Sequence, residues 1–179
     1  MKDKRIVWFS AFRHLVPADY ENWLETMAEE GWHINHFRQW SSIFMILKRG
    51  EPKHYRYVYD PQASPRKDYI ATYEQFGWHY LGRMASAHFW RMEYTGKRPE
   101  AFSDSDSVVA RNRRTMMAVS VSFFIFIFLD LFFAGMQLFF SKSFSDADRT
   151  QIIAAEVFFF ILTVALGIVM LIIRKNEKR

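Results

Sequence analysis

Hydrophobic residues form two long runs near the carboxyl end of the chain. The first run, residues 116–140, holds one acid and one amide, and the second, residues 152–173, holds one acid. Each is longer than the roughly 20 apolar residues that a helix needs to cross a bilayer core. Backbone groups in lipid must be paired within their own segment, so both runs predict transmembrane helices. We expect a helical hairpin over residues 115–174 and a short tail at 175–179.

The region before these runs has shorter patterns, and they occur twice. Gly31–His33 reads Gly-Trp-His, and the same triplet returns at Gly77–His79, an offset of 46. At that spacing an amphipathic helix precedes each triplet and strand-like alternation follows it. We therefore predict an α+β domain over residues 1–95. It would consist of a duplicated strand–helix–strand–strand unit, with two helices on one face of a mostly antiparallel sheet.

The boundaries of these elements follow from local signals. Asp19 is a candidate N-cap for the first helix, and Ser64 followed by Pro65 is a typical helix start for the second. Residues 96–114 are rich in Ser, Asp and basic residues and predict a linker that becomes helical again from Ser107. The strands are expected at 5–12, 32–40, 43–49, 54–60, 78–84 and 88–94.

Charge refines this division of the chain. The mean hydropathy of −0.14 averages two different regions. Of the net charge of +5, residues 1–110 carry +1 and residues 111–179 carry +4. Basic residues flank the two apolar runs, whereas the connector between them is nearly neutral. Because basic flanks stay inside, we expect a multi-pass protein of the plasma membrane with both termini in the cytoplasm, and the case for nucleic-acid binding loses its main support.

Enzyme and metal motifs are missing from the sequence. The chain has no cysteine, which excludes disulfides, thiolate zinc sites and a cysteine nucleophile. It has no glycine-rich phosphate loop, no His-Glu-x-x-His and no Gly-x-Ser-x-Gly. The six histidines form no pair four residues apart. We expect a non-enzyme with no catalytic residues, no metal and no cofactor.

Several short motifs between residues 4 and 95 carry a family resemblance. They are Trp23-Leu24, Ala28–His33, Phe44, Lys48–Pro52, Tyr55–Tyr57 and Tyr73–Trp78. With these motifs the chain resembles the bacterial "domain of unknown function 2812" family. That resemblance implies membrane helices after the domain and a regulatory or stress context, because members are often encoded near PadR-type repressors. It brings no catalytic residues.

The duplicated unit is also similar to the GyrI-like effector-binding domains. This second resemblance implies a cleft that holds amphipathic, often cationic, small molecules against aromatic side chains. Aromatic walls attract flat or cationic ligands, and one acid on the last strand would neutralise such a cation. The alternative is that the same aromatics simply form the core. The candidate ligand-binding residues are Tyr55, Tyr57, Tyr59, Phe89, Trp90, Glu93 and Tyr94.

Polar and small residues in the apolar runs are candidates for membrane packing. An acid within a bilayer is costly and usually has a partner or a role. We expect Asp130, Glu156, Gly135 and Gly167 to make packing or oligomer contacts. Two function hypotheses stay open. The chain is either a membrane-anchored cytosolic sensing or interaction module, which binds an amphipathic small molecule or a protein, or a non-catalytic subunit of a membrane complex or transporter. The expected partners are the lipid bilayer, such a ligand, and an integral-membrane protein or further copies of the chain.

Overall fold

The computed structural model describes residues 3–102, 105–140 and 143–176, and it divides into two compact units. One unit is Met1–Arg114 and the other is Thr115–Glu177. The elements of the first unit, in chain order, are β1 (Lys4–Trp8), α1 (Ser10–Arg13), α2 (Pro17–Glu29), β2 (Trp32–His33), the 3₁₀ turn η1 (Gln39–Ser42), β3 (Phe44–Arg49), β4 (Tyr55–Pro61), α3 (Tyr69–Gln75), β5 (His79–Met84) and β6 (Ala87–Glu93). Two long helices follow, α4 (Ser105–Phe140) and α5 (Asp146–Lys175).

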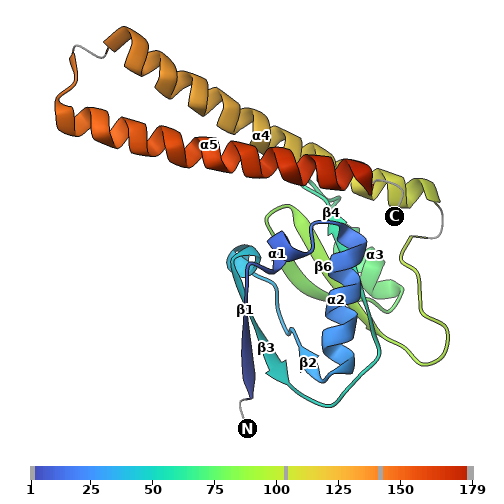
Figure 1. Ribbon diagram of the computed structural model, residues 1–179. Coiled ribbons are helices and arrows are strands. Elements are labelled where there is room, and N and C mark those ends of the chain that lie inside the picture. Colours follow the sequence, from blue (N-terminus) through green and yellow to red (C-terminus); the bar gives the residue numbers. More distant parts are fainter. Residues whose placement is uncertain (1–2, 103–104, 141–142, 177–179) are drawn as a thin grey trace. The chain divides into compact units, whose positions relative to one another are not determined.

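The first unit contains two three-stranded sheets with the same topology (Figure 1). Their strand orders are β1-β3-β2 and β4-β6-β5, and all pairings between these strands are antiparallel. A helix follows the first strand of each sheet, α2 (after the short α1) in the first copy and α3 in the second, so the predicted α+β class and strand–helix–strand–strand order are confirmed. The structure has two sheets where we expected one, and a parallel bridge between Phe37 and Gly82 links them.

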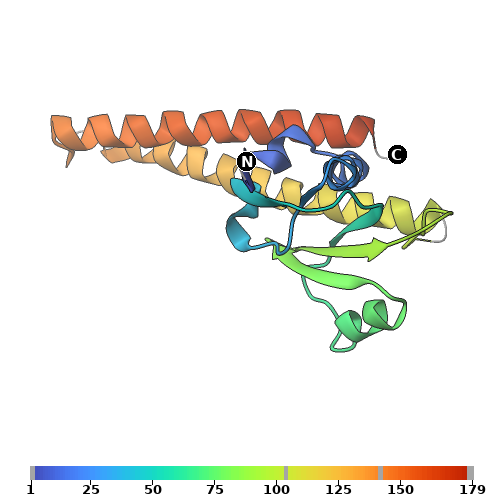
Figure 2. The ribbon, with the colours of Figure 1, turned by 90° about the horizontal axis from the view of Figure 1, so that it is seen from below.

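The two helices lie on opposite faces of the second sheet, so the expectation that they share one face is wrong (Figure 2). Leu24 of α2 packs in the larger core with Phe89 of β6. Tyr73 of α3 packs instead against Trp90, the next residue along the same strand. Successive side chains of a strand point to opposite faces, so α2 and α3 cover different sides.

Several element boundaries differ from those predicted. Helix α2 begins at Pro17, after the N-cap Val16, and so starts before Asp19. Helix α3 begins at Tyr69 instead of Pro65 and is only seven residues long. Strand β2 is only two residues long because the chain after His33 leaves the sheet and forms η1. The predicted glycine helix ends are confirmed, since the equivalent glycines of the two copies have φ angles of 79° and 84°.

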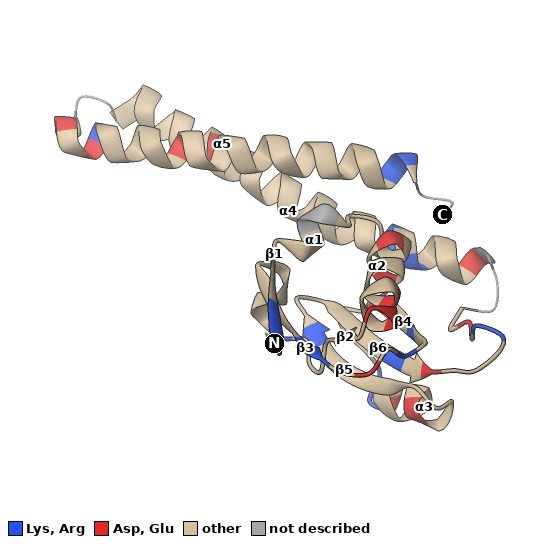
Figure 3. Cartoon of the chain, turned by 60° about the horizontal axis from the view of Figure 1, so that its bottom comes forward, with Lys and Arg blue, Asp and Glu red and all other residues tan. Residues whose placement is uncertain are grey.

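The second unit is the predicted hairpin of apolar helices. Asp106–Phe140 and Asp146–Lys175 are each long and apolar enough to cross a membrane. Figure 3 shows that charged residues are sparse along both helices. Helix α5 starts with a capping box, in which Ser145 Oγ accepts from the Asp148 amide at 3.2 Å and the Asp148 carboxylate accepts from the Ser145 amide at 3.2 Å. Helix α4 begins at Ser105, close to the predicted start at Ser107, and its first turns belong to the first unit.

Candidate functional site

The predicted aromatic residues do not share one wall. Tyr57 and Phe89 lie in the larger core at 1% and 0% exposure. Trp90 is also fully buried, but on the opposite face of the second sheet. Phe37 stacks on Phe89 with ring centroids 3.7 Å apart, which closes the space beside that ring. Burial raises the pKa of Tyr57 to about 12. These three side chains pack the core, and a ligand role for the predicted set as a whole stays a prediction.

The alternation of side chains explains this outcome. Tyr55, Tyr57 and Tyr59 do face the same side of β4, as their spacing predicts. Phe89 and Trp90 are neighbours on β6, so the same rule places them on opposite faces. The sequence therefore contained the signal that separates them, although it did not show which face would be covered.

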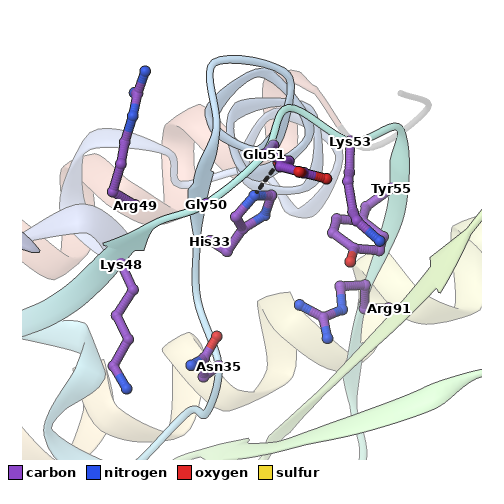
Figure 4. A pocket seen from close by; sticks show the side chains of 9 residues that line it. All are labelled: His33, Asn35, Lys48, Arg49, Gly50, Glu51, Lys53, Tyr55 and Arg91. Carbon is purple, nitrogen blue, oxygen red and sulfur yellow. Dashed lines mark hydrogen bonds between the residues drawn. The ribbon is translucent and has the colours of Figure 1, made fainter. Parts of the chain in front are cut away.

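Of the predicted set, Tyr55 lines an open basic pocket of about 370 Å³ (Figure 4). Tyr55 lies on its wall, and the Arg91 guanidinium sits 4.4 Å from the centre of the Tyr55 ring. Glu93 lies beside the pocket and holds the ammonium group of Lys53 at 2.9–3.0 Å. Glu93 is therefore already paired with a cation. The pocket is lined by His33, Asn35, Lys48, Arg49, Gly50, Glu51, Lys53, Tyr55 and Arg91.

The charge of this pocket favours an anion. Four lysines and arginines line it against the carboxylate of Glu51. Figure 4 shows Lys48 on one side of the pocket and Arg91 on the other, with His33 and Asn35 between them. The His33 ring is held by a 2.7 Å contact between Nε2 and the backbone oxygen of Glu51. These residues come from both copies of the repeat, and the pocket is chemically suited to a small anionic group.

A larger groove of about 570 Å³ lies on the other side of the second sheet. Its aromatic lining comes from Tyr73, Phe76 and Trp78. Tyr73 stacks on the buried Trp90 ring with centroids 4.4 Å apart, whereas Phe76 is 73% exposed. The other lining residues are Thr72, Met92, Pro99, Glu100 and Ala101. Within the part of the chain that the structure describes, Glu100 is the one charged residue of this lining. We name this space the aromatic groove.

Sequence reasoning missed the aromatic groove because one of its walls was assigned to a linker. Residues 99–101 stand in the segment that looked like a polar connection between domains. Ala101 and Phe102 instead pack against the cluster that contains Trp78. A signal was available, because an alanine and a phenylalanine together are unusual in a solvated linker.

Carboxylates of α2 bind the backbone of β4. Glu21 accepts a hydrogen bond from the Tyr59 amide at 2.9 Å, and Glu25 accepts one from the Tyr57 amide at 3.3 Å. The buried Arg56 guanidinium lies between the two acids, 3.0 Å from Glu21 and 2.9 Å from Glu25. The acids therefore satisfy both the charge of Arg56 and two backbone donors that would otherwise be unpaired.

The same network holds the segment that precedes the apolar part of α4. Arg98 donates to Glu25 at 3.0 Å, and Arg111 donates to Glu21 at 2.8 Å. Arg114 donates to Asp60 at 3.0 Å. These ion pairs attach Arg98, Arg111 and Arg114 to α2 and β4, and all three arginines fall within residues 96–114, the predicted linker.

Asp60 connects this network to α3. Its Oδ2 accepts hydrogen bonds from the hydroxyls of Tyr69 and Tyr73, at 2.8 and 3.3 Å. Burial, together with the nearby negative charge of Asp60, raises the pKa of both tyrosines. Tyr69 in turn accepts from the Trp90 indole at 3.2 Å. The side of α3 that faces the sheet is therefore tied to the same polar system that holds the start of α4.

In the hairpin, both predicted acids have partners in the same chain. Thr163 Oγ1 lies 2.6 Å from Asp130 Oδ2, and Gln137 donates to Glu156. Gly167 is close to a neighbouring ring, because a Cβ there would lie 3.4 Å from Phe123, and a Cβ at Gly135 would meet nothing within 4 Å. The predicted contacts with other copies or other proteins stay a prediction.

Metal-ligating residues do not cluster. In residues 3–102, 105–140 and 143–176, no group of three or more His, Cys, Asp or Glu side chains could hold a metal ion.

Comparison with known proteins gives one positive result. No curated protein and no solved structure matches the chain. A family model described as "Protein of unknown function (DUF2812)" matches residues 17–125. The match starts at α2, covers every strand except β1 and continues into the apolar part of α4, so it includes the segment held by Arg111 and Arg114. On this match, the chain belongs to the DUF2812 family.

Proposed function

We propose that this protein is a membrane-anchored sensing module without catalytic activity. Its first unit would lie in the cytoplasm and bind an amphipathic small molecule in the aromatic groove, and its hairpin would cross the plasma membrane with both termini inside. Two helices of sufficient length and apolarity support the anchoring part. The basic residues outside the apolar runs support the orientation.

One observation carries the sensing part. A wall of the aromatic groove is made by Pro99, Glu100 and Ala101, which shortly precede the start of α4 at Ser105. A ligand that enters the groove therefore touches the segment that leads into the first apolar helix. The position of this segment beside Trp78 and Met92 is a feature of the folded structure.

The lining of the groove favours an amphipathic ligand with a flat apolar part and a positive end. Three aromatic side chains and Met92 supply the apolar surface. Glu100 supplies negative charge at the rim, and it lies 3.2 Å from Arg98 and 3.6 Å from Arg56. A cation near Glu100 would compete with these arginines and so reach the ion-pair network.

The network offers a route from the groove to α4. Arg56 and Arg98 both bind Glu25, while Arg56 and Arg111 both bind Glu21. A charge brought to Glu100 would change the balance among these arginines. Because Arg111 lies on α4, this change would act on the start of that helix. A response of this kind is a population shift, and its size is limited by the difference in ligand affinity between the two states.

The groove is tested with the full chain in nanodiscs and rhodamine 6G, a flat cationic dye, by fluorescence polarisation. Phe76 is highly exposed, so Phe76→Ala should leave folding intact. We expect this change to weaken dye binding roughly tenfold, the loss of about one aromatic–cation contact. The control is Ile70→Ala, which removes an exposed apolar side chain of α3 that does not line the groove. Absence of saturable binding to the unchanged protein, or an equal loss in both variants, would refute the groove as the ligand site.

A further inference from the structure

The outer face of the first sheet is apolar and uncovered. The antiparallel register of β1 and β3 places Trp8 opposite Phe44, Ile6 opposite Ile46 and Lys4 opposite Lys48. These six side chains lie on one face, because they occupy alternate positions of both strands. The face is therefore graded, with an aromatic end, an aliphatic middle and a cationic end. We name it the open face.

Large side chains are unusually exposed on this face. Trp8 is 53% exposed, Phe44 is 43% exposed, and both isoleucines are also exposed. Trp40 of η1 lines a groove along this face together with Phe44, and it is 65% exposed. Contiguous exposed aromatics of this kind usually mark a binding surface.

The repeat shows that the equivalent face of the second sheet is covered. Phe44 and Phe89 are equivalent in the two copies, and the residue opposite Phe89 is Tyr59, as Trp8 is opposite Phe44. Phe89 is fully buried against Tyr20 of α2, with ring centroids 5.7 Å apart. The same fold thus uses this face for packing in one copy and leaves it without a partner in the other.

Charge on the open face identifies the kind of partner. A groove of about 480 Å³ runs along it, lined by Lys4, Asn35, His36, Arg38, Trp40, Ser41, Phe44, Met45, Ile46 and Lys48. Three of these residues are cations, and among the described lining residues there is no carboxylate. Lys4 and Lys48 stand directly opposite each other, and like charges in that position are destabilising unless something neutralises them.

We propose that the open face docks on an anionic phospholipid surface. Phosphate groups would neutralise the cations at one end, and the aromatic end would enter the headgroup region, where tryptophan is favoured. A second copy of the chain fits less well. Two such faces would bring cations together with no carboxylate on either face to pair with them.

The basic pocket extends the positive surface of the open face. Lys48 and Asn35 line both the pocket and the groove, so the two are continuous. A lipid headgroup bound at Lys48 would also be near His33, which lies opposite Lys48 in the sheet. The proposal rests on the membrane anchoring proposed above, but it does not depend on the aromatic groove.

The experiment uses the lack of native cysteine. Ile46→Cys and the control Ile70→Cys, two exposed isoleucines on different elements, are labelled with a nitroxide in the full chain. Each protein is reconstituted in phosphatidylcholine and in phosphatidylcholine mixed with phosphatidylglycerol. Vesicle flotation first establishes anchoring in both lipids. Collisions of the label with lipid-soluble oxygen and with a water-soluble nickel complex are then measured by electron paramagnetic resonance.

We expect the label at position 46 to collide less often with the nickel complex and more often with oxygen, and to do so only when phosphatidylglycerol is present. The label at position 70 should not change. Adding Lys4→Ala and Lys48→Ala should lower the equilibrium constant for docking of the open face roughly thirty-fold, because two cations near the lipid surface are lost. Thermal unfolding of each variant shows whether its fold is kept.

Two results would overturn the proposal. One is a label at position 46 that responds equally to both lipids. The other is shielding from both collision partners together with spin–spin broadening, which would show that a second copy covers the face. Failure of the dye experiment would leave this result unaffected, and failure of flotation would count against anchoring itself.

Discussion

Glu21 shows how much one side chain can organise in this protein. Its carboxylate accepts from a β4 amide and from two guanidinium groups, those of Arg56 and Arg111, while it is 2% exposed. A buried ion pair by itself is weak support for stability, because both charges lose their hydration. Here the same acid also satisfies the backbone, so its loss would remove one carboxylate partner from each of two buried cations and leave one amide without its acceptor.

Replacing Glu21 should therefore be severe. We expect Glu21→Ala to lower the free energy of unfolding by about 3–5 kcal/mol, because Arg56 and Arg111 would remain buried without this partner. Tryptophan fluorescence during urea titration of the full chain measures the change. Glu74→Ala is the control, since Glu74 is exposed on α3 and should change stability by no more than about 0.5 kcal/mol. Equal effects of the two changes would contradict the role given to Glu21.

His88 should make stability depend on pH. Burial lowers the pKa of His88 below its ordinary value of 6.5, and Asp60 offsets only part of that shift. Its Nδ1 lies 2.9 Å from the Tyr80 hydroxyl, which donates to it when the imidazole is neutral. The unfolded chain then binds more protons than the folded chain between the folded pKa and 6.5. Stability should fall as the pH drops through that window.

Thermal unfolding of the unchanged protein and of His88→Gln at several pH values tests this. The variant should have a flatter dependence below pH 6.5. His79→Gln is the control because His79 is exposed. A slope that survives in His88→Gln would assign the titration to another group.

Single residues also show what could be predicted from sequence. The common face of Tyr55, Tyr57 and Tyr59 follows from the two-residue period, and the structure agrees. Their availability to a ligand does not follow, because it depends on Phe37 and α2, which reach them from distant parts of the chain. Local periodicity gives the direction of a side chain, while its exposure is set by tertiary packing.

At the scale of elements, the duplication provides natural pairs for comparison. Gly31 and Gly77 both end a helix with positive φ. Their surroundings differ, since a Cβ on Gly31 would lie 2.7 Å from the Gly50 oxygen, whereas one on Gly77 would meet only a methionine methyl group at 3.6 Å. Both positions favour glycine because of their positive φ angles, and only Gly31 is also restricted by a close backbone neighbour.

This difference predicts unequal effects. Gly77→Ala should cost roughly 1–2 kcal/mol for the left-handed conformation alone. Gly31→Ala should cost more, because the backbone of Gly50 would also have to move. Chemical denaturation of the two variants measures both values. Equal losses would mean that the contact between Gly31 and Gly50 relaxes without cost.

The hairpin offers a second comparison between elements. The Thr163 hydroxyl has one proton and lies near two acceptors, Asp130 at 2.6 Å and the Phe159 carbonyl at 3.0 Å. The first contact joins the two helices, and the second lies within α5.

A double-mutant cycle with Asp130→Asn and Thr163→Val should give a coupling energy of about 0.6–1.7 kcal/mol, the range for hydrogen bonds between membrane helices. Unfolding in mixed micelles with increasing denaturing detergent measures it. Thr150→Val replaces Thr163→Val in the control cycle, because the Thr150 hydroxyl bonds within its own helix turn. A coupling equal to that of the control would show that the two helices do not interact through Asp130.

Element type was more predictable than element ends. The two long apolar runs and the glycine-ended helices left clear patterns in the sequence. The start of α3 did not, because Ser64 and Pro65 have the chemistry of a helix start but precede a turn. The brevity of β2 was also hidden, since the residues after His33 alternate like a strand yet leave the sheet to meet β5 through Phe37.

At the scale of the whole molecule, the family match and the ion pairs agree on one point. The first compact unit continues to Arg114. Arg98, Arg111 and Arg114 bind the first unit, and the family match continues to residue 125. Composition described residues 96–114 as a linker because arginines paired with distant acids look the same in sequence as solvated ones.

The proposed membrane orientation predicts a labelling pattern. Ser143→Cys lies in the connector between the helices, and Thr95→Cys lies in the first unit. An impermeant maleimide should modify the first variant in intact cells and the second only after permeabilisation, because basic flanks stay inside. The reverse pattern would invert the orientation, and equal modification of both in intact cells would show that the hairpin does not cross the membrane.

The glutamates of α2 have a further consequence for how copies of the protein behave toward one another. Strand β4 is the outermost strand of its sheet, so its free backbone donors form a template on which a foreign strand could grow. Glu21 and Glu25 occupy two of those donors with side chains. As long as α2 stays in place, these two donors of the β4 edge are not available to another strand. Substitution of these carboxylates would free both donors for pairing with a foreign strand, and fibrillar aggregation is then the expected sign of damage.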